Sequence, residues 1–225
     1  MATKESSAAL KVLEQPGDPS AAADEAAADR PFGSLESMFE EISFGDPADD
    51  KAPRRPRFMG KYDELWQLSL ADPLTGLANR MTLRAHVERC LDNPTTAVVF
   101  IDLNGFKPIN DEHGRATGDE ILRRVASRLE SSVRKGDVVA RYGGDEFVVV
   151  AAIRDPEELR ALAARLAEGI QRPIELPEGT FRLTASVGLA HPGPGDTAAT
   201  LLGRADTAMY IAKQHAEGGG NYPQS

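Results

Sequence analysis

The chain has 225 residues and a formal net charge of −9 at pH 7, a length that suits one domain of ordinary size with a tail, or two small domains. Residues 1–50 hold 3 basic and 12 acidic side chains, whereas residues 51–225 hold 23 of each. This balance excludes a globally basic nucleic-acid-binding protein, because phosphate contacts need an excess of Lys and Arg. The only cysteine, Cys90, cannot form an internal disulfide, so nothing requires an oxidising compartment.

Residues 1–57 are predicted to form a disordered acidic tail followed by a basic, proline-broken linker, since Ala, Asp, Glu, Ser and Pro dominate them. Apolar residues at 35, 38, 39 and 42 follow helical spacing, which indicates either a short docking helix or a transient helix in the tail. The first residues lack the basic and apolar regions of a signal peptide, and no apolar run approaches the roughly 20 residues that cross a bilayer. We therefore expect a cytoplasmic protein without membrane contact.

The folded part is expected to begin near residue 58 and to alternate strands with amphipathic helices. In chain order the pattern predicts helices over 58–71 and 80–91, a strand over 97–102, a helix over 118–133, strands over 138–142 and 147–152, a helix over 156–170, a strand over 181–190 and a helix over 197–215. Residues 218–225 are expected to be a flexible tail. Such alternation, with one tight hairpin over 143–146, indicates the α+β class: a mixed central β-sheet flanked by helices.

Two groups of carboxylates are candidates for chemistry. Asp102 ends an apolar strand, and Asp145 and Glu146 lie at the predicted hairpin tip. Carboxylates at the same edge of a sheet can share hard divalent cations such as Mg²⁺. The turn after Asp102 leads into a helix and carries Gly105 and Lys107, which suits a triphosphate because backbone N–H groups at a helix start attract anions. The alternative is that the hairpin is only a tight turn with solvated acids.

Six motifs identify a family. The chain resembles the GGDEF family of diguanylate cyclases over roughly residues 70–209, and we expect that domain to span 72–217. The matching blocks stand in the family's order: Asp72–Arg80 (DPLTGLANR), Ile101–Asp111 (IDLNGFKPIND), Gly118–Leu122 (GDEIL), Arg141–Phe147 (RYGGDEF), Ser186–Leu189 (SVGL) and Ala205–Tyr210 (ADTAMY).

The resemblance implies a metal-dependent reaction in which two GTP condense to cyclic di-GMP with release of two pyrophosphates. Asp102, Asp145 and the Leu103 carbonyl would hold two Mg²⁺ per active site, or Mn²⁺ in their place. Glu146 would serve either at a metal or in proton transfer, and these two roles stay open. Asn104 stands where the family has a second aspartate at the strand end.

The resemblance also implies the residues that bind substrate. Lys107 and the backbone at Gly105 and Phe106 would cradle phosphates, and Lys213 would contact them from the last helix. Two glycines would let the hairpin backbone approach the nucleotide, and two polar side chains would read guanine through its N1–H and N2–H. The glycines are Gly143 and Gly144, and the guanine readers are Asn110 and Asp119.

Catalysis by this family needs two domains facing one another, so the resemblance implies a homodimer. The helix over 58–71 would couple or dimerise the domains, or simply pack on its own domain. Arg134 and Asp137 match the family's RxxD motif and would bind cyclic di-GMP as an inhibitor, since arginine can bond to guanine O6 and N7. An ordinary helix C-terminus is the alternative reading of this motif.

One departure from the family keeps a second function open. The arginine that usually follows Lys213 is missing, and Glu217 lies nearby. The alternative to an active cyclase is therefore a catalytically weak domain that binds cyclic di-GMP through the RxxD site.

Overall fold

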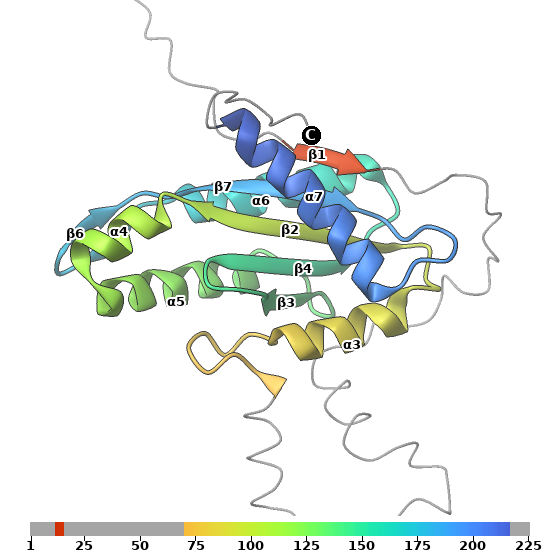
Figure 1. Cartoon of the computed structure of the whole chain (residues 1–225), viewed down its shortest axis with the longest axis horizontal. Coiled ribbons are helices and arrows are strands. Elements are labelled where there is room, and N and C mark those ends of the chain that lie inside the picture. The colour runs from red at the N-terminus through yellow and green to blue at the C-terminus, as the bar shows by residue number, and fades with distance from the viewer. Residues whose placement is uncertain (1–11, 16–69, 217–225) are drawn as a thin grey trace, which may run out of the picture.

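The computed structural model describes residues 12–15 and 70–216 (Figure 1). Its elements are β1 (Val12–Gln15), α3 (Arg80–Cys90), β2 (Thr96–Asn104), α4 (Phe106–His113), α5 (Arg115–Ser131), β3 (Val138–Arg141), β4 (Glu146–Ala152), α6 (Pro156–Gln171), β5 (Ile174–Leu176), β6 (Gly179–Phe181), β7 (Thr184–Ala190) and α7 (Ala198–Ala216). They form a five-stranded sheet of order β1-β7-β2-β4-β3 and a separate β5-β6 hairpin.

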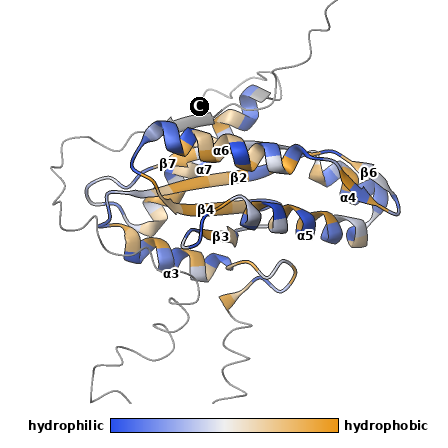
Figure 2. Cartoon of the chain, turned by 180° about the vertical axis from the view of Figure 1, so that it is seen from behind, coloured by the Kyte–Doolittle hydropathy of each residue, from blue (hydrophilic) through white to orange (hydrophobic). Residues whose placement is uncertain are grey.

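The central strand β2 accounts for the layers of the domain. Its residues from Thr96 to Leu103 are all buried, and successive side chains of a strand point to opposite faces. Val99 and Ile101 join the core under α5 and α6, whereas Val98 and Phe100 join the core under α3 and α7. Helices therefore cover both faces, and β2 and β4 lie between them as largely hydrophobic strands (Figures 1 and 2).

The predicted α+β fold with a mixed, helix-flanked sheet is confirmed. β2 is antiparallel to both β4 and β7, β3 is antiparallel to β4, and β1 is parallel to β7. The hairpin between β3 and β4 is where the sequence predicts it. None of the helices in the described ranges is long and apolar enough to cross a membrane.

Three details differ from the sequence-based expectation. The strand predicted over 181–190 is split at Arg182 and Leu183, so that β6 pairs with β5 and β7 joins the main sheet. The helix predicted over 118–133 is α5, which begins at Arg115 and ends at Ser131. The short helix α4 precedes it. Gly114, at φ 83°, breaks the helical run between them because its left-handed backbone suits glycine.

The tail also contains a strand where no regular structure is expected. Val12–Gln15 pairs with Val187–Ala190 along the free edge of β7. Edge pairing uses backbone groups, so a strand of four residues can join a sheet without a long apolar pattern. The remainder of the predicted tail, the 35–42 segment, most of the 58–71 helix and the 218–225 tail lie outside the described residues.

Gly188 fixes the position of α7 on the sheet. A Cβ at this position would lie 2.1 Å from the Ala205 carbonyl oxygen and 2.2 Å from the Met209 nitrogen. The helix backbone therefore packs directly on β7, which only glycine allows. This close approach brings the C-terminal half of α7 beside the end of β2.

Candidate active site

The main-sheet register brings the predicted carboxylates together. Asp102 of β2 pairs with Glu146 of β4 on one side and with Ser186 of β7 on the other. Asp145 precedes Glu146 in the hairpin, and its carbonyl accepts a hydrogen bond from the Leu103 N–H at 3.2 Å. Asp102 is only 7% exposed, whereas Asp145 and Glu146 are half-buried. Three acidic residues thus meet at one edge of the sheet, which we call the acidic edge: Asp102, Asp145, Glu146.

A lysine from the last helix neutralises part of this edge. Lys213 Nζ of α7 lies 2.6 Å from Asp102 Oδ1. The lysine side chain is 28% exposed and the aspartate side chain 10%, so the ion pair is sheltered from solvent. Lys213 is a predicted phosphate ligand, and in this structure it is held by the carboxylate that is predicted to bind metal.

The electrostatics of Glu146 reveal a residue that sequence reasoning missed. Burial raises the pKa of Glu146, and the neighbouring carboxylates of Asp102, Asp206 and Asp145 raise it further, against the opposing charge of Lys213. Asp206 lies on α7, seven residues before Lys213, and therefore on the same side of that helix. Its position in the Ala205–Tyr210 motif is the sequence signal that could have found it.

The two hairpin glycines have different surroundings. A Cβ at Gly143 would lie 2.3 Å from Glu146 Oε2, whereas a Cβ at Gly144 would meet nothing within 4 Å. Gly143 therefore makes room for the Glu146 carboxylate to fold back over the hairpin. No steric reason for Gly144 exists within the domain itself.

An arginine holds the hairpin to the loop that begins the domain. Arg141 donates to the Gly144 carbonyl at 2.8 Å and to Asp72 Oδ1 at 3.1 Å. Burial alone would raise the pKa of Asp72, but hydrogen bonds from Thr75 and Arg141 lower it below its ordinary value. Through Arg141, Asp72 of the Asp72–Arg80 motif thus helps to position the hairpin that carries the acidic edge.

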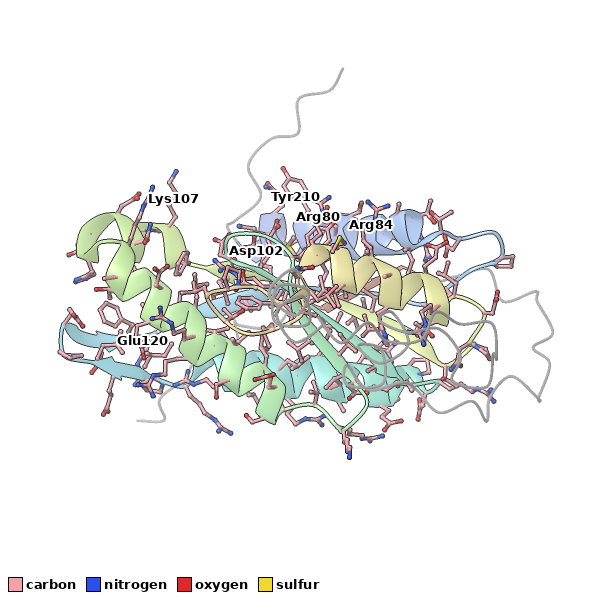
Figure 3. All side chains as sticks on the ribbon, turned by 90° about the horizontal axis from the view of Figure 1, so that it is seen from below. Arg80, Arg84, Asp102, Lys107, Glu120 and Tyr210 are labelled. Atoms are coloured by element: carbon pink, nitrogen blue, oxygen red, sulfur yellow. The ribbon has the colours of Figure 1, made fainter. Side chains whose placement is uncertain are left out.

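The predicted phosphate-binding turn has the expected backbone. Gly105 caps α4 with φ 82°, a left-handed conformation, and provides no side-chain cap for the first N–H groups of that helix. Phe106 packs against the core. Lys107 is exposed and projects outward from α4 rather than toward Asp102 (Figure 3).

The predicted guanine readers are brought together on α4 and α5. A Cβ at Gly118 would lie 2.4 Å from Asn110 Oδ1 and 3.3 Å from the Phe106 ring. The glycine therefore allows the two helices to pack closely, with Asn110 against the start of α5 and next to Asp119. Both residues are half-buried.

The RxxD residues lie in the loop between α5 and β3, not at the end of a helix. The N–H of Arg134 donates to Asp137 Oδ2 at 3.0 Å, and the N–H of Asp137 donates to the Arg134 carbonyl at 3.1 Å. The Arg134 guanidinium pairs with Glu158 of α6. Burial raises the pKa of Asp137, against hydrogen bonds from the backbone and the charges of Arg134 and Arg165. We call this group, with Glu158 and Arg165, the basic loop site.

Whether the acidic edge suits Mg²⁺ can be judged from its donors. Among the described residues, no three His, Cys, Asp or Glu side chains converge closely enough to hold one ion by themselves. The edge does offer hard oxygen donors, and burial together with the neighbouring carboxylates raises the pKa of Glu146 there. Mg²⁺ keeps several water or phosphate ligands, so it needs only one or two carboxylates from the protein. The donor set fits that ion.

Comparisons with known proteins agree with this geometry. The family model "Diguanylate cyclase, GGDEF domain" matches residues 69–218. The bifunctional diguanylate cyclase/cyclic di-GMP phosphodiesterase MucR of Pseudomonas aeruginosa is 42% identical over 162 residues, which cover 69% of this chain and 24% of MucR. The diguanylate cyclase TpbB of the same species (strain UCBPP-PA14) is 42% identical over 158 residues, which cover 65% of this chain and 36% of TpbB.

Solved structures give the same picture. The GGDEF domain of P. aeruginosa TpbB has a TM-score of 0.61 at 39% identity, covering 64% of this chain and 89% of that one. The GGDEF domain of DgcB from Caulobacter crescentus, solved in complex with c-di-GMP, has a TM-score of 0.61 at 28% identity, covering 65% of this chain and 89% of that one. This chain spans about a quarter to a third of the curated relatives MucR and TpbB. From the family match and the shared fold, the chain belongs to the GGDEF family of diguanylate cyclase domains.

Proposed function

We propose that the domain is an active diguanylate cyclase that condenses two GTP into cyclic di-GMP and two pyrophosphates. The observation that carries the proposal is the acidic edge, where Asp102 and Glu146 lie in register and Lys213 Nζ is 2.6 Å from Asp102 Oδ1. Clustered acids with one lysine beside them suit a polyanionic substrate that arrives with divalent metal.

At this edge, Asp102, Asp145 and the Leu103 carbonyl would hold two Mg²⁺, or Mn²⁺. Bound there, the metal would neutralise the triphosphate and polarise its α-phosphorus. Lys213, which lies beside Asp102 in this structure, would contact a phosphate of the bound nucleotide. Glu146, whose pKa is raised by burial and by its neighbours, is suited to take a proton from the attacking 3′-hydroxyl or to ligate the metal.

The rest of the nucleotide would extend from the edge toward α4. The first N–H groups of α4, at Gly105 and Phe106, would bond phosphate oxygens, with Lys107 adding charge. Gly143 and Gly144 would let the hairpin backbone lie against the nucleotide. Asn110 and Asp119 would accept from guanine N1–H and N2–H. Adenine has neither donor there, so GTP is favoured over ATP.

One domain binds one GTP in this arrangement, so two domains must face each other for each 3′-hydroxyl to reach the other's α-phosphate. We therefore propose a homodimer as the catalytic form. Product would bind at Arg134 and Asp137, away from the acidic edge, and would reduce turnover by disfavouring the facing arrangement. Linkage makes this coupling reciprocal.

A receptor without turnover is the second candidate. It is favoured by the missing arginine after Lys213 and by Glu217 in its place in the chain, because both weaken the attraction for a triphosphate. Such a domain would bind cyclic di-GMP through Arg134 without producing it.

Incubation of the purified protein with GTP and Mg²⁺, followed by chromatography of the nucleotides, separates the two candidates. A cyclase yields cyclic di-GMP and pyrophosphate, and an Asp145→Ala variant yields neither. If the folded wild type forms no cyclic di-GMP but binds it, and Arg134→Ala abolishes that binding, the receptor is correct.

A further inference from the structure

The Arg134 side chain has a partner within the domain. Its guanidinium pairs with the Glu158 carboxylate, which comes from the first turn of α6, 24 residues further along the chain. Meanwhile the Arg134 backbone N–H is bonded to Asp137. The loop backbone is therefore set by Asp137, whereas the direction of the guanidinium is set by Glu158.

Glu158 has structural reasons to stay where it is. It lies in the first turn of α6, after the Asp155 N-cap and Pro156, where the helix dipole favours a negative charge. Arg165 lies seven residues later, on the same side of the helix, and donates to the Ser132 carbonyl at 2.9 Å. α6 thus presents a carboxylate and a guanidinium to the same loop, with Arg134 held at the carboxylate.

A guanidinium whose Nη2 bonds the Glu158 carboxylate is drawn toward α6, and its positive charge is partly neutralised there. Both effects weaken a bidentate contact to the O6 and N7 of guanine. Cyclic di-GMP also carries two phosphodiester charges, which the Glu158 carboxylate repels. The ion pair is exposed, at 67% for Arg134 and 40% for Glu158, so it is weak enough to be broken by a ligand.

We propose that Glu158 is a competing latch for the product site: it bonds the Arg134 guanidinium, competes with cyclic di-GMP for that side chain, and thereby weakens product affinity. The proposal rests on the proposed product site at Arg134 and Asp137. It adds a residue that sets the concentration at which product inhibits.

The chain offers a matched control for this proposal. Glu157 is the adjacent residue in the same turn of α6, is 80% exposed and pairs with Arg160 of its own helix at 2.5 Å. Glu157→Gln and Glu158→Gln remove the same charge from the same helix end, but only the second frees Arg134. Glutamine keeps the length and polarity of the side chain, so the helix start is preserved.

The test is calorimetric titration of cyclic di-GMP into the full chain without GTP, for wild type, Glu158→Gln, Glu157→Gln and Arg134→Ala. We expect Glu158→Gln to bind about three-fold tighter than wild type, the size that an exposed ion pair allows, and Glu157→Gln to match wild type. The ratio between Glu158→Gln and wild type should shrink as salt is raised, because the lost ion pair is screened. Arg134→Ala should lose binding.

Each contrary outcome has its own meaning. Equal or weaker binding by Glu158→Gln overturns the latch while leaving the product site intact, since weaker binding would make Glu158 a ligand of the base. An equal gain in affinity from Glu157→Gln also overturns it, because the loss of any negative charge at this helix end would then account for the tighter binding. If no variant binds, the product site itself is wrong and the latch falls with it.

Discussion

The acidic edge and the basic loop site both depend on a charged pair, but they are built in opposite ways. At the acidic edge, Lys213 and Asp102 are sheltered and come from α7 and β2, which the core holds in place. At the basic loop site, Arg134 and Glu158 are exposed, and Arg134 comes from a loop. The first pair lies among like charges that need a cation, whereas the second lies beside a free surface that can accept an anion.

The difference in exposure between the two ion pairs predicts how each site responds to substitution and to a ligand. Sheltered charges held by the core are costly to remove and have large effects on chemistry. Exposed pairs contribute little to stability and can therefore exchange partners when a ligand arrives. The proposed catalytic site should therefore be rigid, whereas the proposed product site should be adjustable.

The largest effect is expected from Asp145→Ala. Loss of this carboxylate should reduce cyclic di-GMP formation by on the order of 100- to 1,000-fold, because charge stabilisation at the reacting phosphate is removed. Asp145 lies half-buried in a turn, so the fold should persist in circular dichroism. Asp137→Ala, at the basic loop site, is the control and should change product inhibition while leaving the initial rate near wild type. An equal loss of the initial rate in both variants would contradict the contrast drawn between the two sites.

Lys213→Met should raise the KM for GTP by about ten-fold, because a charge-assisted contact to phosphate is lost. The same variant should bind Mn²⁺ more tightly without nucleotide, measured by electron paramagnetic resonance, since Asp102 loses a competing cation. Lys135→Met, an exposed change next to Arg134 in the chain, should alter neither value. A Lys213 variant that weakened both GTP and Mn²⁺ binding would show that the lysine supports the metal site instead of competing for it.

Asp72→Asn tests the second sheltered pair, in which the Arg141 and Asp72 side chains are 15% and 18% exposed. The free energy of unfolding should fall by about 1.5 kcal/mol, as expected for hydrogen bonds to a charged group. The pKa of Asp72 is lowered in the fold, so its contribution is full above the unfolded pKa and is lost as pH falls through the folded pKa. Wild type and variant should therefore converge in urea titrations at acidic pH. If wild type and variant had equal free energies of unfolding at neutral pH, this stabilising role of Asp72 would be ruled out.

The smallest effect is a gain in stability from Glu146→Gln. Because the pKa of Glu146 is raised in the fold, the native state holds its proton to higher pH than the unfolded chain, and stability declines as pH rises through that window. In metal-free buffer the variant should melt a few degrees higher than wild type at pH 7, whereas the two should coincide at about pH 3 and below, where the carboxyl is protonated in both states. A lower melting temperature at pH 7 would mean that the like charges are already compensated.

Local pattern predicts much of this molecule. The apolar run before Asp102 predicts a central strand, and the two glycines before Asp145 predict the hairpin; together they predict that the carboxylates meet. The bounds of β4 and α6 lie within one residue of those expected. These elements are predictable because their periodicity and turn residues agree with the burial that the fold imposes.

What the pattern could not predict depends on contacts between distant parts of the chain. The Lys213–Asp102 pair joins residues 111 positions apart, and its geometry follows from the packing of α7 on Gly188. Asp206 lies in a recognisable motif, but the motif does not say what Asp206 contacts, because only that packing brings it near Glu146. The split at Arg182 follows from β5, which is too short to show a period, and β1 pairs through its backbone along the edge of β7.

Progress curves of cyclic di-GMP formation, recorded for wild type and Arg134→Ala at the same GTP and Mg²⁺ concentrations, test the central claim that one domain holds a catalytic site and a separate, adjustable product site. The two proteins should start at the same rate. Wild type should then slow with GTP still present, while Arg134→Ala continues to completion. Curves that coincide throughout, or an Arg134→Ala curve that is slower from the first minutes, would contradict the account.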